Sequence, residues 1–402
     1  MENNKYINDR FVKTNNAMLK SRKLKKIKSI MYYVDRNLNI YVRKPKKQDN
    51  NKKRVLIVFN LALGDGVVFL CAIKNIRKLY PEKDYILDIA CQKGLESIYT
   101  NIGIFDTIIP LEFTKGTVSV KERYNIIKKL NNNYYDLVLD PVGANECSTN
   151  VLMTRNVKAE KKIGAIMEML PRSCSKHIIK KTYNEIKKIK SKSLIEQYYE
   201  FFYDKYNVEF IDLPCEKVNL DIPEKYYVLF PSASTELKRW PMDRYVEIVR
   251  RIYKKTKLPL LICGTNSDKK SYDELRELIK YDNIPIIDVL GKTNLLSFFE
   301  IIKKAQFVIT NDTSTYHIAV ISQTPVAIIA GGYVYDKYIL YDFKGKEKYK
   351  RPYVIVNKMK CFNCYNECST VNEGHGVWPC LYKISVDYAW KIIEKMIEKE
   401  VN

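Results

Sequence analysis

The chain has 402 residues, of which 46% are hydrophobic, and a formal net charge of +23. This length is enough for two ordinary domains with full apolar cores, and without a run of 18 apolar residues no transmembrane helix is expected. The polar start MENNKYINDR lacks the apolar stretch of an export signal. We therefore expect a cytoplasmic protein whose ten cysteines are thiols or metal ligands.

Residues 1–50 are predicted to form a basic helical arm. Residues 1–54 carry 17 Lys and Arg against 4 Asp and Glu, which is more than half of the net charge. Leu24, Ile27, Met31 and Val34 recur at helical spacing among lysines, a pattern typical of a helix lying on an anionic membrane. A helix docked on this protein or on a second subunit fits equally well. A nucleic-acid partner is not expected, because no nucleic-acid module follows.

Residues 51–212 are predicted to form a first Rossmann-like domain. An apolar strand at 55–59 leads into NLALGDGVVFL, where Gly64, Asp65 and Gly66 form a tight turn before a helix at 67–79. This turn matches neither G-x-G-x-x-G nor a P-loop, so no dinucleotide site is expected, and Asp65 alone could simply be a helix cap. Further strands are expected at 85–90, 105–109, 135–140 and 162–165, and helices at 120–130, 145–155 and 193–206.

Residues 213–385 are predicted to form a second Rossmann-like domain, after a linker at 212–225 that contains two prolines. Residues 386–402 form the C-terminal helix, Val386 to Glu400, which we expect to pack back on the domains. Strands are expected at 226–230, 258–263, 284–289, 307–309 and 326–329, with helices ending near 255 and 280 and others at 295–304 and 314–322. The predicted fold class is therefore α/β, with two doubly wound domains facing across a cleft.

Three polar segments follow predicted strands of these domains: the turn with Asp65, the loop 232–238, and the segment 312–317. Ligands of such sheets bind at the carboxyl ends of the strands. A helix that begins near 312–314 offers free backbone N–H groups to a phosphate. Taken alone, Asp312 could merely cap that helix and His317 merely pack. Three polar segments at equivalent strand ends favour one shared site.

Four segments, in this order, resemble glycosyltransferase family 9, the lipopolysaccharide heptosyltransferases, which have the GT-B fold. They are VLIVFNLALGDGVVFLCAIKNIRKLYP, YYVLFPSASTELKRWPMDRYVEIV, LGKTNLLSFFEIIKKAQFVITNDTSTYHIAVISQTPVAII, and the cysteine-bearing CFNCYNEC with WPCLYKIS. The chain departs from the family pattern at Ser314, where Gly is usual, and at Gly66, where Val or Ile is frequent.

The resemblance implies an inverting, metal-independent transfer of a sugar, commonly heptose from ADP-heptose, onto lipopolysaccharide core. Asp65 would be the general base on the acceptor hydroxyl, and Lys238 would neutralise the leaving diphosphate. Asp312 would orient its turn or bind a sugar hydroxyl, and His317 would donate to a phosphate or to the sugar. The remaining residues implied to bind the donor are Ser234, Thr235, Thr313 and Ser314.

Two other functions remain open from the sequence. One is a protein glycosyltransferase of the same family, acting on exported adhesins, and the other is a non-catalytic GT-B scaffold protein. Partners are then a nucleotide-sugar donor, a lipopolysaccharide or protein acceptor, and peripheral contact with an anionic inner membrane.

No cofactor is expected for catalysis, but the tail has the spacing of a structural metal site. Cys361-x2-Cys364-x3-Cys368 followed by Cys380 would suit a tetrahedral zinc or iron ion. His375 is a possible substitute ligand. Reduced thiols in a tail loop are the alternative.

Overall fold

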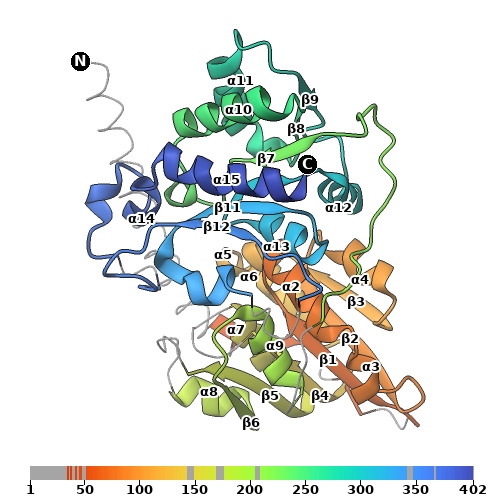
Figure 1. Cartoon of the computed structure of the whole chain (residues 1–402). Coiled ribbons are helices and arrows are strands. Elements are labelled where there is room, and N and C mark those ends of the chain that lie inside the picture. The colour runs from red at the N-terminus through yellow and green to blue at the C-terminus, as the bar shows by residue number, and fades with distance from the viewer. Residues whose placement is uncertain are drawn as a thin grey trace. The chain divides into compact units, whose positions relative to one another are not determined.

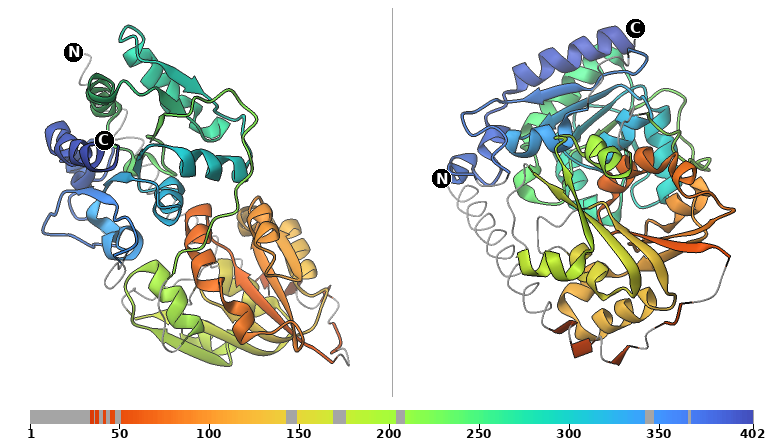
Figure 2. Two further views of the ribbon diagram at one scale, coloured as in Figure 1. Left: turned by 45° about the vertical axis from the view of Figure 1, so that its right-hand side comes forward. Right: turned by 90° about the horizontal axis from the view of Figure 1, so that it is seen from below.

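The computed structural model describes residues 34–35, 37–38, 41–42, 45–47, 51–142, 149–168, 176–203, 209–341, 347–365 and 368–401. The chain divides into two compact units between Ile211 and Asp212. Each unit contains one six-stranded sheet in which all neighbouring strands are parallel (Figures 1 and 2). The predicted α/β class with two doubly wound sheets is therefore confirmed.

The sheet of the first unit has the strand order β3-β2-β1-β4-β5-β6. Five consecutive buried residues, Val55 to Phe59, make β1 a central strand, as its continuous apolar run predicts. The strands are β1 Lys53–Phe59, β2 Tyr85–Gln92, β3 Thr107–Leu111, β4 Tyr135–Asp140, β5 Ala159–Met167 and β6 Glu185–Ile189. The helices are α2 Leu63–Ile73, α3 Ile76–Leu79, α4 Glu96–Ile102, α5 Phe113–Val118, α6 Val120–Leu130, α7 Thr149–Asn156, α8 Lys176–Thr182 and α9 Leu194–Phe202.

One difference from the predicted elements concerns the position of Asp65. The helix α2 begins at Leu63, four residues before the predicted start at Val67. The backbone N–H of Gly66 donates to the carbonyl of Ala62 at 2.9 Å, so helical hydrogen bonding already includes the predicted turn. Asp65 therefore lies in the first turn of α2 and not before it. This position is at the positive end of the helix dipole.

The sheet of the second unit has the order β12-β11-β10-β7-β8-β9. Its strands are β7 Tyr227–Phe230, β8 Leu260–Ile262, β9 Ile286–Asp288, β10 Val308–Asn311, β11 Val326–Ala330 and β12 Tyr353–Val356. Its helices are α10 Met242–Thr256, α11 Lys269–Ile279, α12 Leu295–Lys304, α13 Ser314–Ile321, α14 Pro379–Tyr382 and α15 Val386–Glu400. Shorter helical turns are η1 Glu236–Lys238, η2 Asn266–Asp268, η3 Gly332–Val334, η4 Tyr335–Ile339 and η5 Val371–Gly374.

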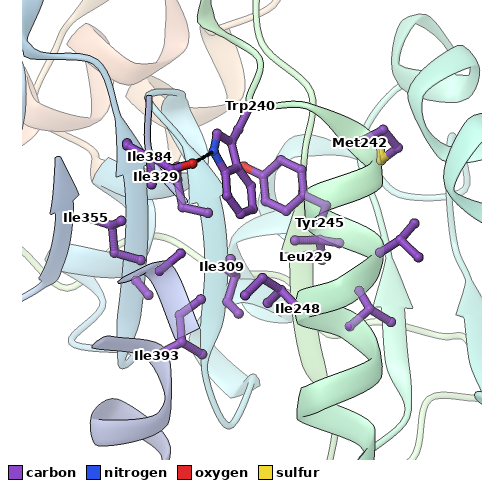
Figure 3. Packing of buried hydrophobic residues seen from close by; sticks show 14 of the residues in the cluster. Leu229, Trp240, Met242, Tyr245, Ile248, Ile309, Ile329, Ile355, Ile384 and Ile393 are labelled. Carbon is purple, nitrogen blue, oxygen red and sulfur yellow. Dashed lines mark hydrogen bonds between the residues drawn. The ribbon is translucent and has the colours of Figure 1, made fainter. Parts of the chain in front are cut away.

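The core of the second unit is built around Trp240, which is 1% exposed. Its ring packs edge-on against Tyr245, with the ring centroids 5.0 Å apart, and its Nε1–H donates to the carbonyl of Ile384 at 3.1 Å (Figure 3). The helix α15 packs on β11, β12 and α10 of the same unit and contributes Ile393 to this core. The chain after β12 is thus an integral part of the second unit.

Little of the predicted basic arm falls within the described residues. Leu24, Ile27 and Met31 lie outside them, but Asp35 is fully buried against α6. Its carboxylate accepts hydrogen bonds from Nε and Nη2 of Arg123, at 2.6 and 2.5 Å. In the described part of the chain, no helix is both long enough and apolar enough to span a membrane.

Candidate active site

Lys238 and Asp312 form an ion pair at one edge of the second sheet. Lys238 ends η1, the turn that follows β7, and Asp312 directly follows β10. Because β7 and β10 are neighbours in the sheet, their carboxyl ends bring the two side chains together, with Nζ of Lys238 3.1 Å from Oδ2 of Asp312. This edge is also where the strand order reverses, which is the position at which ligands bind in open α/β sheets.

The carboxylate of Asp312 is enclosed, although the ion pair reaches the surface through Lys238. The side chain of Asp312 is 8% exposed and that of Lys238 26%. The hydroxyl of Tyr333 also donates to Oδ2 of Asp312, at 2.8 Å, and Lys238 lies over the Tyr333 ring. Burial alone would raise the pKa of Asp312, but Lys238 and Tyr333 outweigh burial and hold the pKa below its usual range. Asp312 is therefore an anion that fixes its cationic partner.

Asn311 holds the end of β10 against the segments on either side of it. Its side chain is fully buried and accepts hydrogen bonds from the backbone N–H of Trp240 at 3.2 Å and from the hydroxyl of Tyr245 at 2.8 Å. Its Nδ2 donates to the carbonyl of Pro231 at 2.6 Å. Every part of this buried amide is satisfied, so the loop after β7 and the end of β10 form one rigid support for the ion pair.

Thr313 and Ser314 begin α13 beside Asp312. Thr313 is the N-cap residue, but its side chain makes no capping bond and instead shares a hydrogen bond with the hydroxyl of Thr310 at 3.1 Å. Both Thr313 and Ser314 are partly exposed. The first turn of α13 thus presents backbone N–H groups and the positive end of the helix dipole next to Lys238, an arrangement suited to a phosphate.

His317 lies one turn further along α13 and is 5% exposed. Its Nδ1 shares a hydrogen bond of 2.7 Å with the hydroxyl of Tyr341. Burial lowers the pKa of His317 to about 4, opposed by the attraction of Asp312. The imidazole is therefore neutral near pH 7, so any contact it makes with a donor sugar or phosphate is a neutral hydrogen bond.

The loop 231–235 separates β7 from η1 and contains the predicted donor residues Ser234 and Thr235. Both are exposed. The guanidinium of Arg239 donates to the carbonyl of Ala233 at 3.0 and 3.3 Å, which fixes the base of the loop. The structure therefore places both hydroxyl groups on an accessible loop next to the Lys238 turn, without enclosing either of them.

The predicted base, Asp65, belongs to the first unit and is partly buried. Burial, with smaller contributions from Cys91 and Asp65, raises the pKa of the Tyr99 hydroxyl well above its ordinary value. The strand β1 that leads to Asp65 is paired with β4, at the point where the order of the first sheet reverses. Asp65 thus occupies the same topological position in its unit as Lys238 does in the second.

Sequence reasoning missed Asp140, which ends β4 at this edge of the first sheet. It is fully buried and accepts hydrogen bonds from the hydroxyls of Thr154, at 3.2 Å, and Tyr183. The backbone N–H of Val142 donates to its other oxygen at 3.2 Å. An Asp at the end of an apolar strand, directly before Pro141, was the available signal. These bonds make Asp140 a support for the strand end next to β1.

The four cysteines proposed as metal ligands all line one small pocket in the second unit, with Tyr333, Phe362 and Trp378 among its other walls. The thiol of Cys380 accepts a hydrogen bond from the N–H of Gly332 at 3.2 Å, and burial raises its pKa. His375 does not line this pocket and packs against Tyr382 instead. Among the residues whose positions are described, no three His, Cys, Asp or Glu side chains are grouped so as to hold a metal ion.

The model of glycosyltransferase family 9 (heptosyltransferase) matches residues 123–330, just over half of the chain, and the chain belongs to this family. It is therefore a glycosyltransferase with the GT-B fold. It is similar to the lipopolysaccharide core heptosyltransferase OpsX of Haemophilus influenzae, with 23% identity over 68% of this chain and 78% of that protein.

Solved structures agree with this fold. A family 9 glycosyltransferase from Veillonella parvula superposes with a TM-score of 0.65 at 14% identity, covering 88% of this chain and 100% of the other. The heptosyltransferase WaaC of E. coli, solved with ADP-2-deoxy-2-fluoro heptose, gives a TM-score of 0.59 at 18% identity and covers 85% of this chain and 99% of that one.

Proposed function

We propose that this protein transfers heptose from ADP-heptose onto lipopolysaccharide core, with inversion at the sugar carbon and without a metal ion in the chemical step. The ion pair of Lys238 and Asp312 carries the proposal. It holds the ammonium group of Lys238 beside the first turn of α13, where a diphosphate would bind. The family and the ADP-heptose analogue bound to WaaC support the choice of donor.

On the donor side, negative charge develops on the diphosphate as the bond from its oxygen to the sugar carbon breaks. Lys238 and the N–H groups of the first turn of α13 stabilise that charge, and they are positioned before the reaction begins. Thr313, Ser314, Ser234 and Thr235 supply hydroxyl donors around the phosphates. Asp312 holds Lys238 in place and accepts a hydrogen bond from a hydroxyl group of the sugar.

On the acceptor side, Asp65 takes the proton of the attacking hydroxyl, whose oxygen forms the new bond to the sugar carbon on the face opposite the departing ADP. One carboxylate is enough for this single displacement. Asp65 lies in the first turn of α2, at the positive end of the helix dipole. The proposed base thus belongs to the first unit, and the proposed diphosphate site belongs to the second.

His317 completes the donor site as a neutral group. In the tautomer in which Nδ1 accepts from the Tyr341 hydroxyl, Nε2 carries the proton and donates to an oxygen of the donor. A neutral imidazole avoids placing a second buried cation next to Lys238. The hydroxyl of Tyr341 fixes the ring orientation.

We further propose that Cys361, Cys364, Cys368 and Cys380 hold a structural zinc or iron ion. In the described positions the four side chains line one pocket without being grouped as ligands, so they would have to draw together around the ion, for which four thiolates are a suitable ligand set. Metal analysis of the purified protein tests this proposal, with about one ion per chain expected. A variant with all four positions changed to Ser should contain none.

Calorimetric titration with ADP, UDP and GDP tests the donor proposal. Selective binding of ADP supports ADP-heptose, whereas preference for UDP or GDP would replace heptose with another sugar, and binding of none would favour the non-catalytic scaffold. Transfer of heptose to lipopolysaccharide core, assayed beside an exported adhesin, tests the acceptor. Transfer to the adhesin alone would establish the protein glycosyltransferase instead.

A further inference from the structure

The segment 359–384, here called the cysteine tail, contacts the donor site on both sides of the Lys238–Asp312 pair. One set of contacts reaches Tyr333, whose hydroxyl binds Asp312, and the other reaches the turn that carries Lys238. The sequence offers no reason for this arrangement, because the tail lies more than 40 residues beyond Asp312 and follows the last strand of the sheet.

Backbone hydrogen bonds from the cysteine tail hold the Tyr333 segment directly. The N–H of Asn363 donates to the carbonyl of Gly332, and the N–H of Tyr365 donates to the carbonyl of Tyr333, each at 2.7 Å. From the other side, the thiol of Cys380 accepts from the N–H of Gly332. The Tyr333 ring also packs against Trp378, with centroids 5.6 Å apart. Tyr333, 2% exposed, is therefore fixed at both its backbone and its ring.

The second set of contacts fixes the Lys238 turn. The N–H of Trp378 donates to the carbonyl of Leu237, directly before Lys238, at 2.9 Å. Two residues after Lys238, the indole N–H of Trp240 donates to the carbonyl of Ile384 at the end of the tail (Figure 3). The tail therefore sets the positions of both Tyr333 and the backbone that carries Lys238.

The cysteine tail packs tightly against η3. A Cβ added to Gly332 would lie 2.5 Å from the Phe362 ring, and one added to Gly331 would lie 2.5 Å from the Tyr333 ring and 3.2 Å from the Cys380 sulfur. Any added atom must displace an aromatic ring. A displacement of the tail is therefore transmitted to Tyr333.

We propose that Tyr333 is a positioning residue of the diphosphate site and that the cysteine tail holds it in place. A change in the position of the tail therefore changes how tightly the protein binds its donor. This inference rests on the proposed function for its readout in donor binding. The hydroxyl of Tyr333 shares the charge of Asp312, so that Lys238 remains available to the phosphate instead of being fully neutralised by Asp312. Without that hydroxyl, Asp312 binds Lys238 more tightly and competes with the donor.

The variant Tyr333→Phe tests the proposal and retains the ring that packs on Trp378. We expect ADP to bind about tenfold more weakly, the loss expected for one hydrogen bond to a charged group. We also expect the acid limb of the kcat/KM profile to move to higher pH, because the hydrogen bond lowers the pKa of Asp312. Tyr353→Phe, on β12 of the same unit, is the matched control, since it removes a hydroxyl that donates to the carboxylate of Glu400 at the end of α15. Equal ADP affinity and equal profiles in the two variants would overturn the proposal.

A measurement without nucleotide separates this inference from the proposed function. Labelling of Lys238 by an amine-reactive ester, followed by mass spectrometry, reports how tightly Asp312 holds the ammonium group. Tyr333→Phe should slow this labelling several-fold relative to wild type and to Tyr353→Phe. Unchanged labelling would overturn the positioning role even if the wild type binds ADP. Slower labelling in a protein that binds no nucleotide would support the positioning role and defeat the proposed function.

The role of the tail itself is tested by Gly332→Ala. The new methyl group collides with Phe362, so we expect weaker ADP binding similar in size to that of Tyr333→Phe. Adding Phe362→Ala removes the ring that the methyl group meets and should restore most of the affinity, which a general loss of stability would not do. Failure of the second substitution to restore binding, or no effect of the first, would contradict transmission through the tail.

Discussion

The ammonium group of Lys238 is paired with Asp312, so a phosphate that binds Lys238 competes with this carboxylate. The variant Lys238→Ala removes the ammonium group that pairs with Asp312. The negative charge of Asp312 is then uncompensated next to the phosphate site. We expect ADP affinity to fall roughly 30- to 100-fold, as for the loss of one strong charge-assisted contact. Calorimetry measures the change, and the exposed Lys254→Ala on α10 is the control. Equal ADP affinity in the two variants would remove Lys238 from the donor site.

Asp65 is expected to act on the acceptor and not on the nucleotide. The variant Asp65→Asn keeps the size of the side chain but cannot accept a proton, so heptose transfer should fall by about 10²- to 10⁴-fold. Binding of ADP should remain as in the wild type, because the diphosphate site belongs to the other unit. Transfer at the wild-type rate in Asp65→Asn would rule out its role as general base.

His317 makes the stability of the protein depend on pH in a defined window. Because its pKa is about 4 in the folded chain and near 6.5 when unfolded, the unfolded chain binds one more proton between these values. Stability should therefore decrease as the pH falls from 6.5 to 4, by up to about 3 kcal/mol from this group. The pKa of Asp312 is lowered from 3.8, so its contribution is lost only at more acidic pH.

Urea unfolding of wild type and His317→Gln between pH 7 and pH 4 measures this difference. The variant should start from lower stability, because it loses the bond to Tyr341, but should lose less with acid. A slope identical to that of the wild type would show that the imidazole is not buried in its neutral form.

At the scale of elements, the buried pair of Arg123 and Asp35 anchors the end of the N-terminal segment to α6. Both side chains are fully buried. Asp35→Ala leaves an uncompensated guanidinium inside the protein and should lower the free energy of unfolding by about 3–5 kcal/mol. Replacing both partners, with Asp35→Leu and Arg123→Met, should recover a large part of that loss. Denaturant unfolding of wild type, Asp35→Ala and the double variant provides the test, and an Asp35→Ala protein as stable as wild type would contradict the buried pairing.

The elements that sequence reasoning located well are those with a strong apolar period. The bounds of β4, α6, α12 and α15 match their predicted ranges. In contrast, β6 and β12 were not predicted, and each is the last strand at the edge of its sheet. Edge strands bury one side less completely, and β6, with the sequence EIKKI, carries two lysines. The two missing strands are thus those in which burial imposes the weakest pattern.

The site shows a similar division between what sequence can and cannot reveal. Strand-end reasoning selected Lys238 and Asp312, because the carboxyl ends of neighbouring parallel strands must lie together. Tyr333 and Tyr341 escaped notice, since they follow β11 in helical turns and loop without a periodic pattern. Their roles depend on the cysteine tail and on the depth at which Asp312 and His317 are buried, which only tertiary packing determines.

At the scale of the whole molecule, the two units repeat one topology and differ in charge at equivalent positions. Numbered from the first strand of each sheet, both have the order 3-2-1-4-5-6. At the edge where the order reverses, the first unit provides Asp65 and Asp140, whereas the second provides Lys238 paired with Asp312. The proposed function assigns the acceptor hydroxyl to the carboxylate of the first unit and the leaving diphosphate to the cation of the second.

The uneven distribution of charge leads to a prediction about membranes. Residues 1–33 carry nine Lys and Arg against two acidic residues, and each basic group near an anionic surface contributes about 1 kcal/mol at low salt. We expect the full chain to cosediment with phosphatidylglycerol vesicles at 0.1 M salt and to be released at 1 M, because the Debye length falls from about 10 to 3 Å. Vesicles of neutral phosphatidylcholine should not bind it.

Deletion of residues 1–33 should abolish this cosedimentation. The truncation leaves Asp35 in place, so the buried pair with Arg123 is preserved and the melting temperature and ADP affinity should stay close to those of the full chain. If the truncated protein still binds anionic vesicles, the attraction comes from the remaining surface. If the full chain binds neither kind of vesicle, the basic arm instead docks on protein, and the acceptor must be brought to the enzyme by contacts with the two units.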